Sequence, residues 1–303
     1  MVKQLITSRS ARVYFEKLTN IRHCKYPNRC VCRGKGDPKQ TQQHKEDRVF
    51  NASYKVNETF IPELRGRNIN RYSIQWNNEY LSYGPWIAEP RDPKFFKGER
   101  ILIRQIPNKL NLVVSYTNEP YVIDQSIYTA INTSDLDTKY ILCILNSKLI
   151  GYYFKNKFSE FDGVFPKIKI GHFKSLPIKH ANTKEQHSFE ENANMMLTLN
   201  TDLQSSTDKL MRSITRHFNI QSFSTKLQKW HQLSFKEFIS EIKKSKVKLS
   251  LSKETEWDDF FIEEKSKAEN IKNQLYKTDN KIDLMIYSLY DLTNEEISII
   301  EST

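Results

Sequence analysis

Three cysteines and one histidine near the N-terminus are the residues of this chain that most resemble a metal site. His23, Cys24, Cys30 and Cys32 have the side chains that a zinc ion prefers. Their spacing differs from that of two CxxC-like pairs, since a single residue separates Cys30 from Cys32. Four cysteines in 303 residues are also too few for a disulfide framework. We therefore expect ordinary reduced thiols and no metal ligands.

The motifs of the common DNA-modifying and nucleotide-binding enzymes are missing from the sequence. Metal-dependent nucleases carry Asp-x-Lys or Glu-x-Lys on adjoining strands, but the strings of this kind at residues 37–39, 92–94 and 263–265 fall in expected loops or in a helix. No two of the ten prolines are adjacent, so the Asn/Asp-Pro-Pro-aromatic element of an amine-modifying methyltransferase is absent. There is also no GxGxxG loop, P-loop or nucleophile elbow. We assign no catalytic residue and no cofactor to this chain.

Basic and aromatic residues alternate instead along residues 65–104. Arginine and lysine side chains hold phosphates, and arginine or glutamine can read base edges through paired donors. Aromatic rings stack on unpaired bases or form a domain core, and the core is the expected role for most of these rings. The basic members of this set are Arg65, Arg67, Arg71, Arg91, Lys94, Lys97, Arg100 and Arg104.

The net charge of +11 is unevenly distributed along the chain. Residues 1–180 contain 30 Lys and Arg against 16 Asp and Glu, whereas residues 181–303 contain 17 against 20. A basic first part is typical of a protein with a polyanionic partner, although a basic surface can also serve solubility alone. No stretch reaches the roughly 20 apolar residues needed to cross a membrane, and the N-terminus lacks a secretory signal. We expect a cytoplasmic protein that does not contact a membrane.

Two kinds of secondary structure are expected, and together they indicate an α+β fold. Alternating apolar residues predict strands at residues 71–76, 101–106, 112–116 and 121–131, and residues 138–156 form the one clear helix of the first part. We expect a mixed strand-and-loop recognition domain over residues 1–180, followed by a helical spacer and docking region over residues 181–303.

The second part contains no proline after residue 184 and is expected to be entirely helical. Long helices are predicted at residues 185–218 and 254–290, and capping boxes open shorter helices at Ser234 and Thr293. Apolar residues repeat every seven positions on the last long helix, as in an antiparallel coiled coil. The helix at residues 185–218 is the simplest partner for this seam, and a second protein is the competing one. The seam consists of Phe261, Ala268, Leu275, Ile282 and Leu289, with Ile271, Thr278, Met285 and Leu292 as the second row.

Six sequence strings, in order, resemble the TaqI-like specificity domain, the target-recognition domain of type IIG restriction–modification enzymes and related N6-adenine DNA methyltransferases. They are GKGDPKQT, LRGRNINRYSIQW, PWIAEPRDPKFFKGERILIRQI, YVIDQSIYTAI, YILCILNSKLIGYYF and FPKIKIGHFKSLPI. The closing stretch KIDLMIYSLYDLTNEEISIIE resembles the C-terminus of the same proteins. The resemblance covers roughly residues 30–180 and 250–303.

The resemblance implies a domain that reads duplex DNA for a methyltransferase or endonuclease module that is absent from this chain. S-adenosylmethionine and Mg²⁺ would then belong to that module or to a partner subunit. The chain itself would be a specificity subunit, a fragment or a gene remnant. The residues expected to contact DNA are Lys35, Lys39, Gln40, Arg65, Gly66, Asn70, Arg71, Tyr72, Arg91, Lys94, Arg100, Arg104, Asn146, Ser147, Lys148, Lys167 and Lys169.

Three hypotheses follow from the sequence. The leading one is a DNA-sequence-recognition domain without catalysis of its own. The second is one part of an adenine methyltransferase that acts only with a catalytic partner. The third is a structural or interaction protein whose C-terminal helical seam binds another protein.

Overall fold

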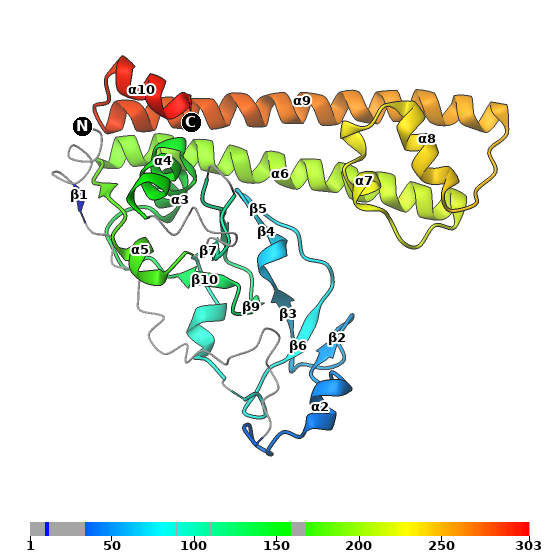
Figure 1. Cartoon of the computed structure of the whole chain (residues 1–303), viewed down its shortest axis with the longest axis horizontal. Helices are drawn as coiled ribbons and strands as arrows, with labels where there is room; N and C mark the ends of the chain where they lie inside the picture. Colours follow the sequence, from blue (N-terminus) through cyan, green and yellow to red (C-terminus); the bar gives the residue numbers. More distant parts are fainter. Residues whose placement is uncertain (1–9, 12–33, 89, 109–110, 159–167, 303) are drawn as a thin grey trace. The chain divides into compact units, whose positions relative to one another are not determined.

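The computed structural model describes residues 10–11, 34–88, 90–108, 111–158 and 168–302. It is an α+β structure that divides into two compact units (Figure 1). The first unit comprises Met1–Ala193 together with Ile282–Thr303, and the second comprises Asn194–Lys281. The last residues of the chain therefore belong to the same unit as the strand-and-loop region.

Two small sheets and a hairpin form the centre of the first unit. Strands β7 (Arg100–Arg104), β8 (Val114–Thr117) and β10 (Ile127–Ala130) pair antiparallel in the order β10-β7-β8. A second sheet has the order β2-β6-β3-β9, in which β3 and β9 are parallel. Its strands are β2 (Asn51–Ala52), β3 (Phe60–Leu64), β6 (Tyr80–Ser82) and β9 (Val122–Ile123). Leu64, Leu102 and Ile127 are buried in the core that these strands share.

The strand predicted at residues 71–76 is confirmed only at residues 73–74, because the chain reverses direction at Arg71 and Tyr72. Strand β4 (Ile69–Asn70) pairs antiparallel with β5 (Ser73–Ile74), and Arg71 and Tyr72 form the two-residue turn between them. The φ of Tyr72 is 56°, a left-handed conformation that is uncommon for a bulky residue. Its backbone N–H donates to the Val114 carbonyl at 3.0 Å, and its ring is buried.

The predicted helix at residues 138–156 is two helices, α3 (Thr138–Asn146) and α4 (Lys148–Lys157). Ser147 separates them because its backbone is extended, with ψ at 154°, and its hydroxyl accepts the N–H of Ile150 at the start of α4. A serine at this position satisfies a backbone donor that a continuous helix would pair with a carbonyl. α3 is buried along almost its whole length.

Short elements complete the first unit. Helix α2 (Gln42–Glu46) precedes β2, and α5 (Ile170–Lys174) precedes β11 (Ile178–Lys179), which pairs antiparallel with β1 (Ser10–Ala11). Two 3₁₀ helices, η1 (Gly66–Asn68) and η2 (Pro93–Phe96), lie in the loops between strands.

The C-terminal residues of the first unit are bonded to its strand-and-loop region. Helix α10 (Asn294–Glu301) begins at the capping box that the sequence predicts at Thr293. The Tyr290 hydroxyl donates to the Pro177 carbonyl at 2.7 Å and accepts the Lys179 N–H at 3.0 Å. Lys148 pairs with Glu301 at 2.7 Å. These contacts make residues 282–301 part of this unit.

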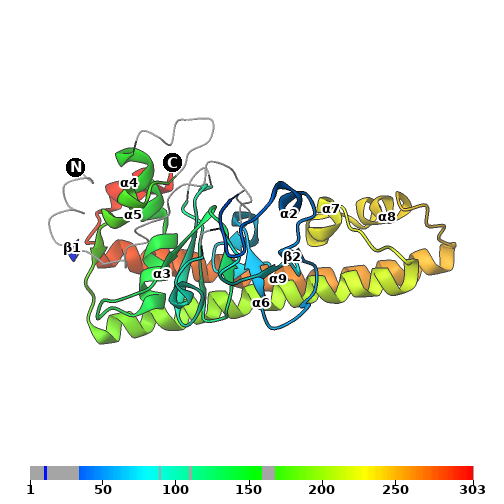
Figure 2. The same cartoon turned by 90° about the horizontal axis from the view of Figure 1, so that it is seen from below.

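The second unit is built on two long antiparallel helices. α6 (Thr183–Phe218) and α9 (Leu251–Leu289) confirm the predicted long helices, and their parts in this unit run side by side in both views (Figures 1 and 2). Lys209 pairs with Glu264 at 2.9 Å, and Thr278 contacts the sulfur of Met195 at 3.4 Å. Residue 195 of α6 lies beside residue 278 of α9, and residue 209 lies beside residue 264, so the two helices are antiparallel.

A short helical insertion covers the seam of α9. Helices α7 (Thr225–Gln228) and α8 (Phe235–Lys243) lie between the long ones in sequence, and the Ser234 capping box opens α8 as predicted. The Trp230 and Phe238 rings contact Phe261 with centroids 5.9 and 4.7 Å apart, and Ala268 is fully buried. This part of the seam therefore packs within its own chain. No helix among the described residues is long and apolar enough to span a membrane.

Candidate functional site

Lys35 and Lys39 are exposed on a loop, residues 34–40, that is fastened to residues 85–86. Gln40 is buried, and its side-chain amide donates to the Trp86 carbonyl at 2.5 Å. The backbone N–H of Asp37 donates to the Pro85 carbonyl at 3.0 Å. A Cβ on Gly36 would lie 2.3 Å from the Trp86 carbonyl oxygen, so only glycine fits there. These contacts fix the path of the loop. The buried Gln40 anchors the loop and is not part of its exposed surface.

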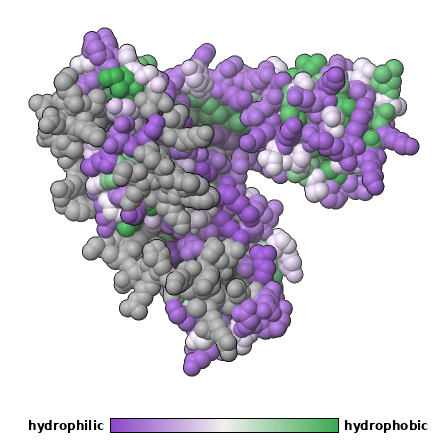
Figure 3. All heavy atoms as spheres, viewed as in Figure 1, coloured by the Kyte–Doolittle hydropathy of each residue, from purple (hydrophilic) through white to green (hydrophobic). Residues whose placement is uncertain are grey.

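Lys94 lies on a second loop that is fastened to the same region. The Tyr83 hydroxyl bonds to both backbone polar groups of Arg91, and the Tyr83 ring contacts Phe96 edge-on at 5.1 Å. Asp92 caps the short helix η2 by accepting the Lys94 N–H at 3.0 Å. Since both loops are bonded to residues 83–86, Lys35, Lys39 and Lys94 belong to one end of the unit. In the space-filling view, hydrophilic residues predominate near α2 at this end (Figure 3).

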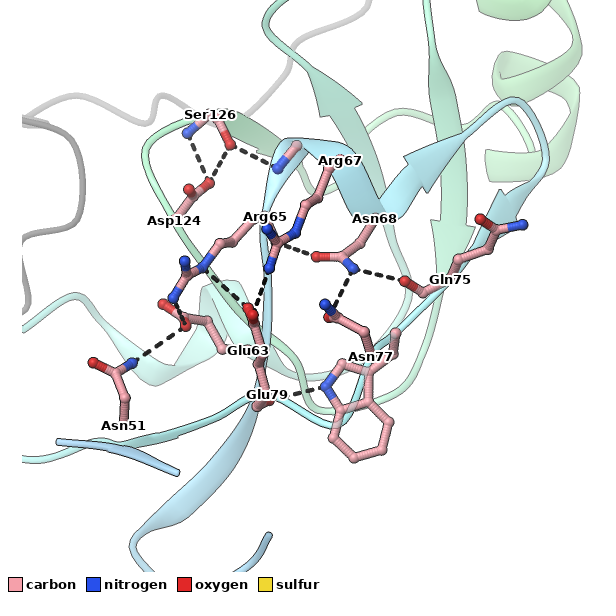
Figure 4. Close-up of polar contacts among 12 residues, drawn as sticks. Asn51, Glu63, Arg65, Arg67, Asn68, Gln75, Asn77, Glu79, Asp124 and Ser126 are labelled. Carbon is pink, nitrogen blue, oxygen red and sulfur yellow. Dashed lines mark hydrogen bonds and ion pairs between the residues drawn. The ribbon is translucent and has the colours of Figure 1, made fainter. Parts of the chain in front are cut away.

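Arg65 is held inside a cluster of charged residues (Figure 4). Its Nη2 lies 3.0 Å from Glu63 Oε2, and its Nε lies 3.2 Å from Glu79 Oε2. Burial raises the pKa of Glu63 above its ordinary value, although Arg65 acts in the opposite direction. Two carboxylates thus balance the Arg65 charge, and the arginine stabilises the end of β3.

The short helix η1 follows Arg65 and is bonded on both sides. The Gly66 N–H donates to the Ser126 hydroxyl at 2.7 Å, and a Cβ on Gly66 would lie 2.9 Å from that oxygen. Asn68 accepts the Arg65 N–H at 2.7 Å and donates to the Gln75 carbonyl at 2.6 Å. Gly66 is therefore a structural residue, and Asn70 is half-buried in β4 beyond it.

Arg71, Tyr72, Asn146 and Ser147 meet in the interior rather than at the surface. The Arg71 Nη2 donates to the Asn146 carbonyl at 2.8 Å. The Asn146 side chain is fully buried and pairs with both backbone polar groups of Val114. Tyr72, Asn146 and Ser147 are each at most 2% exposed, so they hold the turn, β8 and α4 together.

Arg100 is also buried, which differs from the expected contact with DNA. Its guanidinium donates to the carbonyls of Gly98, at 2.6 Å, and Glu119. Burial lowers the pKa of Arg100 to about 10. Arg104 donates to the Ile106 carbonyl at 2.7 Å and to the Asn108 side chain at 2.8 Å. Both arginines close loops next to β7.

Lys148 and Lys169 lie on other elements than the two loops that carry the three lysines. Lys148 binds Glu301 and lies 3.8 Å from Asp283, so its charge is balanced by the C-terminal helices. Lys169 is exposed at the start of α5. Lys167 lies outside the described residues.

Within the described ranges, no group of three or more His, Cys, Asp or Glu residues is placed to hold a metal ion. The His23, Cys24, Cys30 and Cys32 cluster lies outside them. Cys143 is buried in α3, and its sulfur contacts the Phe189 carbonyl at 3.6 Å.

Arg67 has the exposure that most of the expected arginines lack. Its side chain is 59% exposed on η1, and its guanidinium bonds to Glu79 through Nη2. The sequence shows Arg67 within the basic stretch, but the family resemblance did not select it. The Arg-Gly-Arg string gives no signal for this difference in exposure, because Arg65 and Arg67 flank the same glycine.

Comparisons with known proteins cover most of the described chain. Residues 61–178 match the family described as the TaqI-like C-terminal specificity domain, and residues 182–286 match a domain of unknown function, DUF8810. A comparison with curated proteins finds no match. Among solved structures, the chain is similar to the type IIL restriction–modification enzyme MmeI in complex with DNA. The TM-score is 0.43 at 12% identity, over 92% of this chain and 36% of that one, so this chain spans little more than a third of that length. Residues 61–178 of this chain are therefore similar to the TaqI-like C-terminal specificity domain.

Proposed function

We propose that this chain recognises a specific sequence in double-stranded DNA for an adenine-N6 methyltransferase or endonuclease module of a restriction–modification system. The match of residues 61–178 to the specificity domain carries this proposal. The helices of residues 182–286 would then serve as a spacer and docking element for that module. Catalysis, S-adenosylmethionine and Mg²⁺ are assigned to the module.

The distribution of exposed cations supports a DNA partner. Lys35, Lys39 and Lys94 are exposed on two loops fastened to residues 83–86, where they can contact phosphates. The paired or buried arginines, Arg65, Arg100 and Arg104, instead fix the end of β3 and the loops next to β7. The exposed lysines can contact DNA, and the bonded arginines hold the backbone in place. This arrangement is typical of a binding surface that is preorganised in the free protein.

Duplex binding by the full chain tests the proposal. The probe is a pool of duplexes with a randomised central segment, from which bound molecules are sequenced and then measured individually by fluorescence anisotropy. We expect one preferred sequence. With about six phosphate contacts, affinity should fall several hundred-fold or more between roughly 50 and 200 mM salt.

A charge-reversal variant localises the contact. Replacing Lys35, Lys39 and Lys94 with Glu should weaken binding to every duplex and reduce the salt dependence by up to about one unit of slope per lost contact. The matched control replaces Lys253, Lys272 and Lys277, exposed lysines of α9, and makes the same change in net charge. Equal losses for the two variants, or salt-independent binding by the wild-type chain, would contradict the proposal.

The interaction-protein hypothesis has less support, because Phe261 and Ala268 of the seam are buried by residues of their own unit. A coiled-coil partner would have to displace α8 and the Trp230 ring. We therefore keep DNA recognition as the proposed function.

A further inference from the structure

Arg67 is the exposed arginine of the specificity domain. Residues 61–178 contain six arginines, all of them within the described ranges, and the other five are buried or half-buried. The Arg67 side chain is 59% exposed, compared with 18% for its neighbour Arg65. An arginine that reaches solvent from this domain is therefore the exception.

The backbone on both sides of Arg67 is fixed. Gly66 and Asn68 are buried, and each is bonded to a different segment of the chain. Gly66 binds Ser126, whose N–H donates to Asp124 at 2.8 Å. Asn68 donates to Gln75 and, at 3.0 Å, to the side chain of Asn77. These bonds hold the Cα of Arg67 in one place without any contact from the Arg67 side chain.

Glu79 also fixes the direction of the Arg67 side chain. Figure 4 shows the Arg65 and Arg67 side chains converging on this carboxylate. One Glu79 oxygen binds Arg65 Nε at 3.2 Å, and the other binds Arg67 Nη2. Among the described residues, one of the five guanidinium N–H donors of Arg67 bonds to Glu79, and a ligand with paired acceptors can use the others.

Resting on the proposed function, we propose that Arg67 is a specificity-determining residue that reads the O6 and N7 acceptors of a guanine, with Glu79 as its positioning residue. Paired acceptors on a guanine edge match the fork of a guanidinium. A phosphate suits this arginine less, because Glu79 places a negative charge against the same guanidinium. The exposed lysines suit phosphates better, because an ammonium is a compact point charge without a fork.

The test compares base preference with overall affinity, using the randomised duplex pool on the full chain. The wild-type chain should select a sequence with a fixed G·C pair. Arg67→Ala should reduce the preference for G·C over the other base pairs at that position by about 10- to 100-fold. The preferences at the other positions should change little. Arg67→Lys should keep the affinity for unrelated duplexes but lose the discrimination, because an ammonium lacks the fork. Arg212→Ala, which removes an exposed arginine of α6, is the charge-matched control and should change neither.

Glu79→Gln tests the positioning role. Loss of the Glu79 carboxylate should raise the affinity for unrelated duplexes. It should also reduce the preference for the fixed G·C pair over other base pairs at that one position. A residue that only stabilised the fold would not give this combination. Thermal unfolding of each variant, followed by circular dichroism, shows that the comparison concerns folded protein.

Three outcomes separate the inference from the proposed function. If Arg67→Ala retains the wild-type preference, or weakens all duplexes equally, Arg67 does not read a base. If Glu79→Gln changes neither discrimination nor the affinity for unrelated duplexes, Glu79 does not position it. If the wild-type chain has no sequence preference, the proposed function itself fails.

Discussion

The side chain of Asn146 replaces a missing strand partner for Val114. Its amide nitrogen donates to the Val114 carbonyl at 3.0 Å, and its amide oxygen accepts the Val114 N–H at 3.3 Å. Both residues are fully buried. An asparagine at the end of α3 thus completes the hydrogen bonding of β8 in the way that another backbone would.

Replacement of Asn146 by alanine should therefore destabilise the first unit by about 1–3 kcal/mol, because the buried Val114 N–H loses its partner, whereas the Val114 carbonyl keeps the Tyr72 N–H. Urea unfolding measures this loss, and hydrogen exchange at the Val114 amide locates it. Asn156→Ala, an exposed asparagine of α4, is the control and should change stability by less than about 0.5 kcal/mol. Equal effects of the two substitutions would show that the Val114 bonds contribute nothing.

Gly66→Ala should disturb the turn that carries Arg67. The new methyl group would lie 2.9 Å from the Ser126 hydroxyl, and the overlap should cost about 1–3 kcal/mol. Gly171→Ala provides the matched control, since a Cβ there meets no atom within 4 Å and the residue lies in helix α5. Comparison of the urea midpoints tests the prediction, and a Gly66→Ala midpoint at or above that of Gly171→Ala would refute it.

Tyr290→Phe should loosen the C-terminal residues from the strand-and-loop region. The substitution removes the hydroxyl that bonds to Pro177 and to Lys179, at an expected cost of about 1–3 kcal/mol. Faster hydrogen exchange at the Lys179 amide is the direct measurement. Tyr276→Phe removes a hydroxyl from a side chain that is 69% exposed and should leave that amide unchanged.

The stability of the second unit should depend on the ionisation of Glu264. Burial raises its pKa, but hydrogen bonds from Lys209 and Lys267 outweigh this effect and hold the pKa below the ordinary value of 4.5. A lowered carboxyl pKa stabilises the folded state above pH 4.5, and this stabilisation is lost as the pH falls through the lowered value.

Glu264→Gln should accordingly lower the free energy of unfolding by about 1–2 kcal/mol at neutral pH. The difference from the wild-type chain should disappear in acid, below the lowered pKa. Glu263→Gln, at a largely exposed neighbour, should have an effect of less than about 1 kcal/mol. A Glu264→Gln difference that persists unchanged in acid would rule out the charge as its cause.

Secondary structure could be predicted from the sequence where the pattern that specifies it lies within one short segment. The helices α6 and α9 follow from the spacing of apolar residues, and the starts of α8 and α10 follow from Ser-x-x-Glu and Thr-x-x-Glu. These patterns depend on neighbours within one or two turns, so no tertiary contact is needed to interpret them.

Prediction failed where a distant contact decides the conformation. Alternation at residues 71–76 indicates a strand, yet the bond from Tyr72 to Val114 stabilises a reversal at Arg71 and Tyr72. Ser147 fits a continuous helix by propensity, but it ends α3 and caps α4. Neither Val114 nor the buried site of Asn146 is visible in the local sequence.

By itself, the sequence determined the fold class, the long helices, the uneven charge and the similarity of residues 61–178 to the TaqI-like specificity domain. Only the tertiary structure decided which cations reach solvent. Arg65, Arg100 and Arg67 are the same residue type in one basic stretch. Two carboxylates surround Arg65, two backbone carbonyls accept hydrogen bonds from the Arg100 guanidinium, and Arg67 bonds only to Glu79 among the described residues. Exposure depends on which groups fold against a side chain, and the sequence does not show that Glu79 folds back on Arg65 or Glu119 on Arg100.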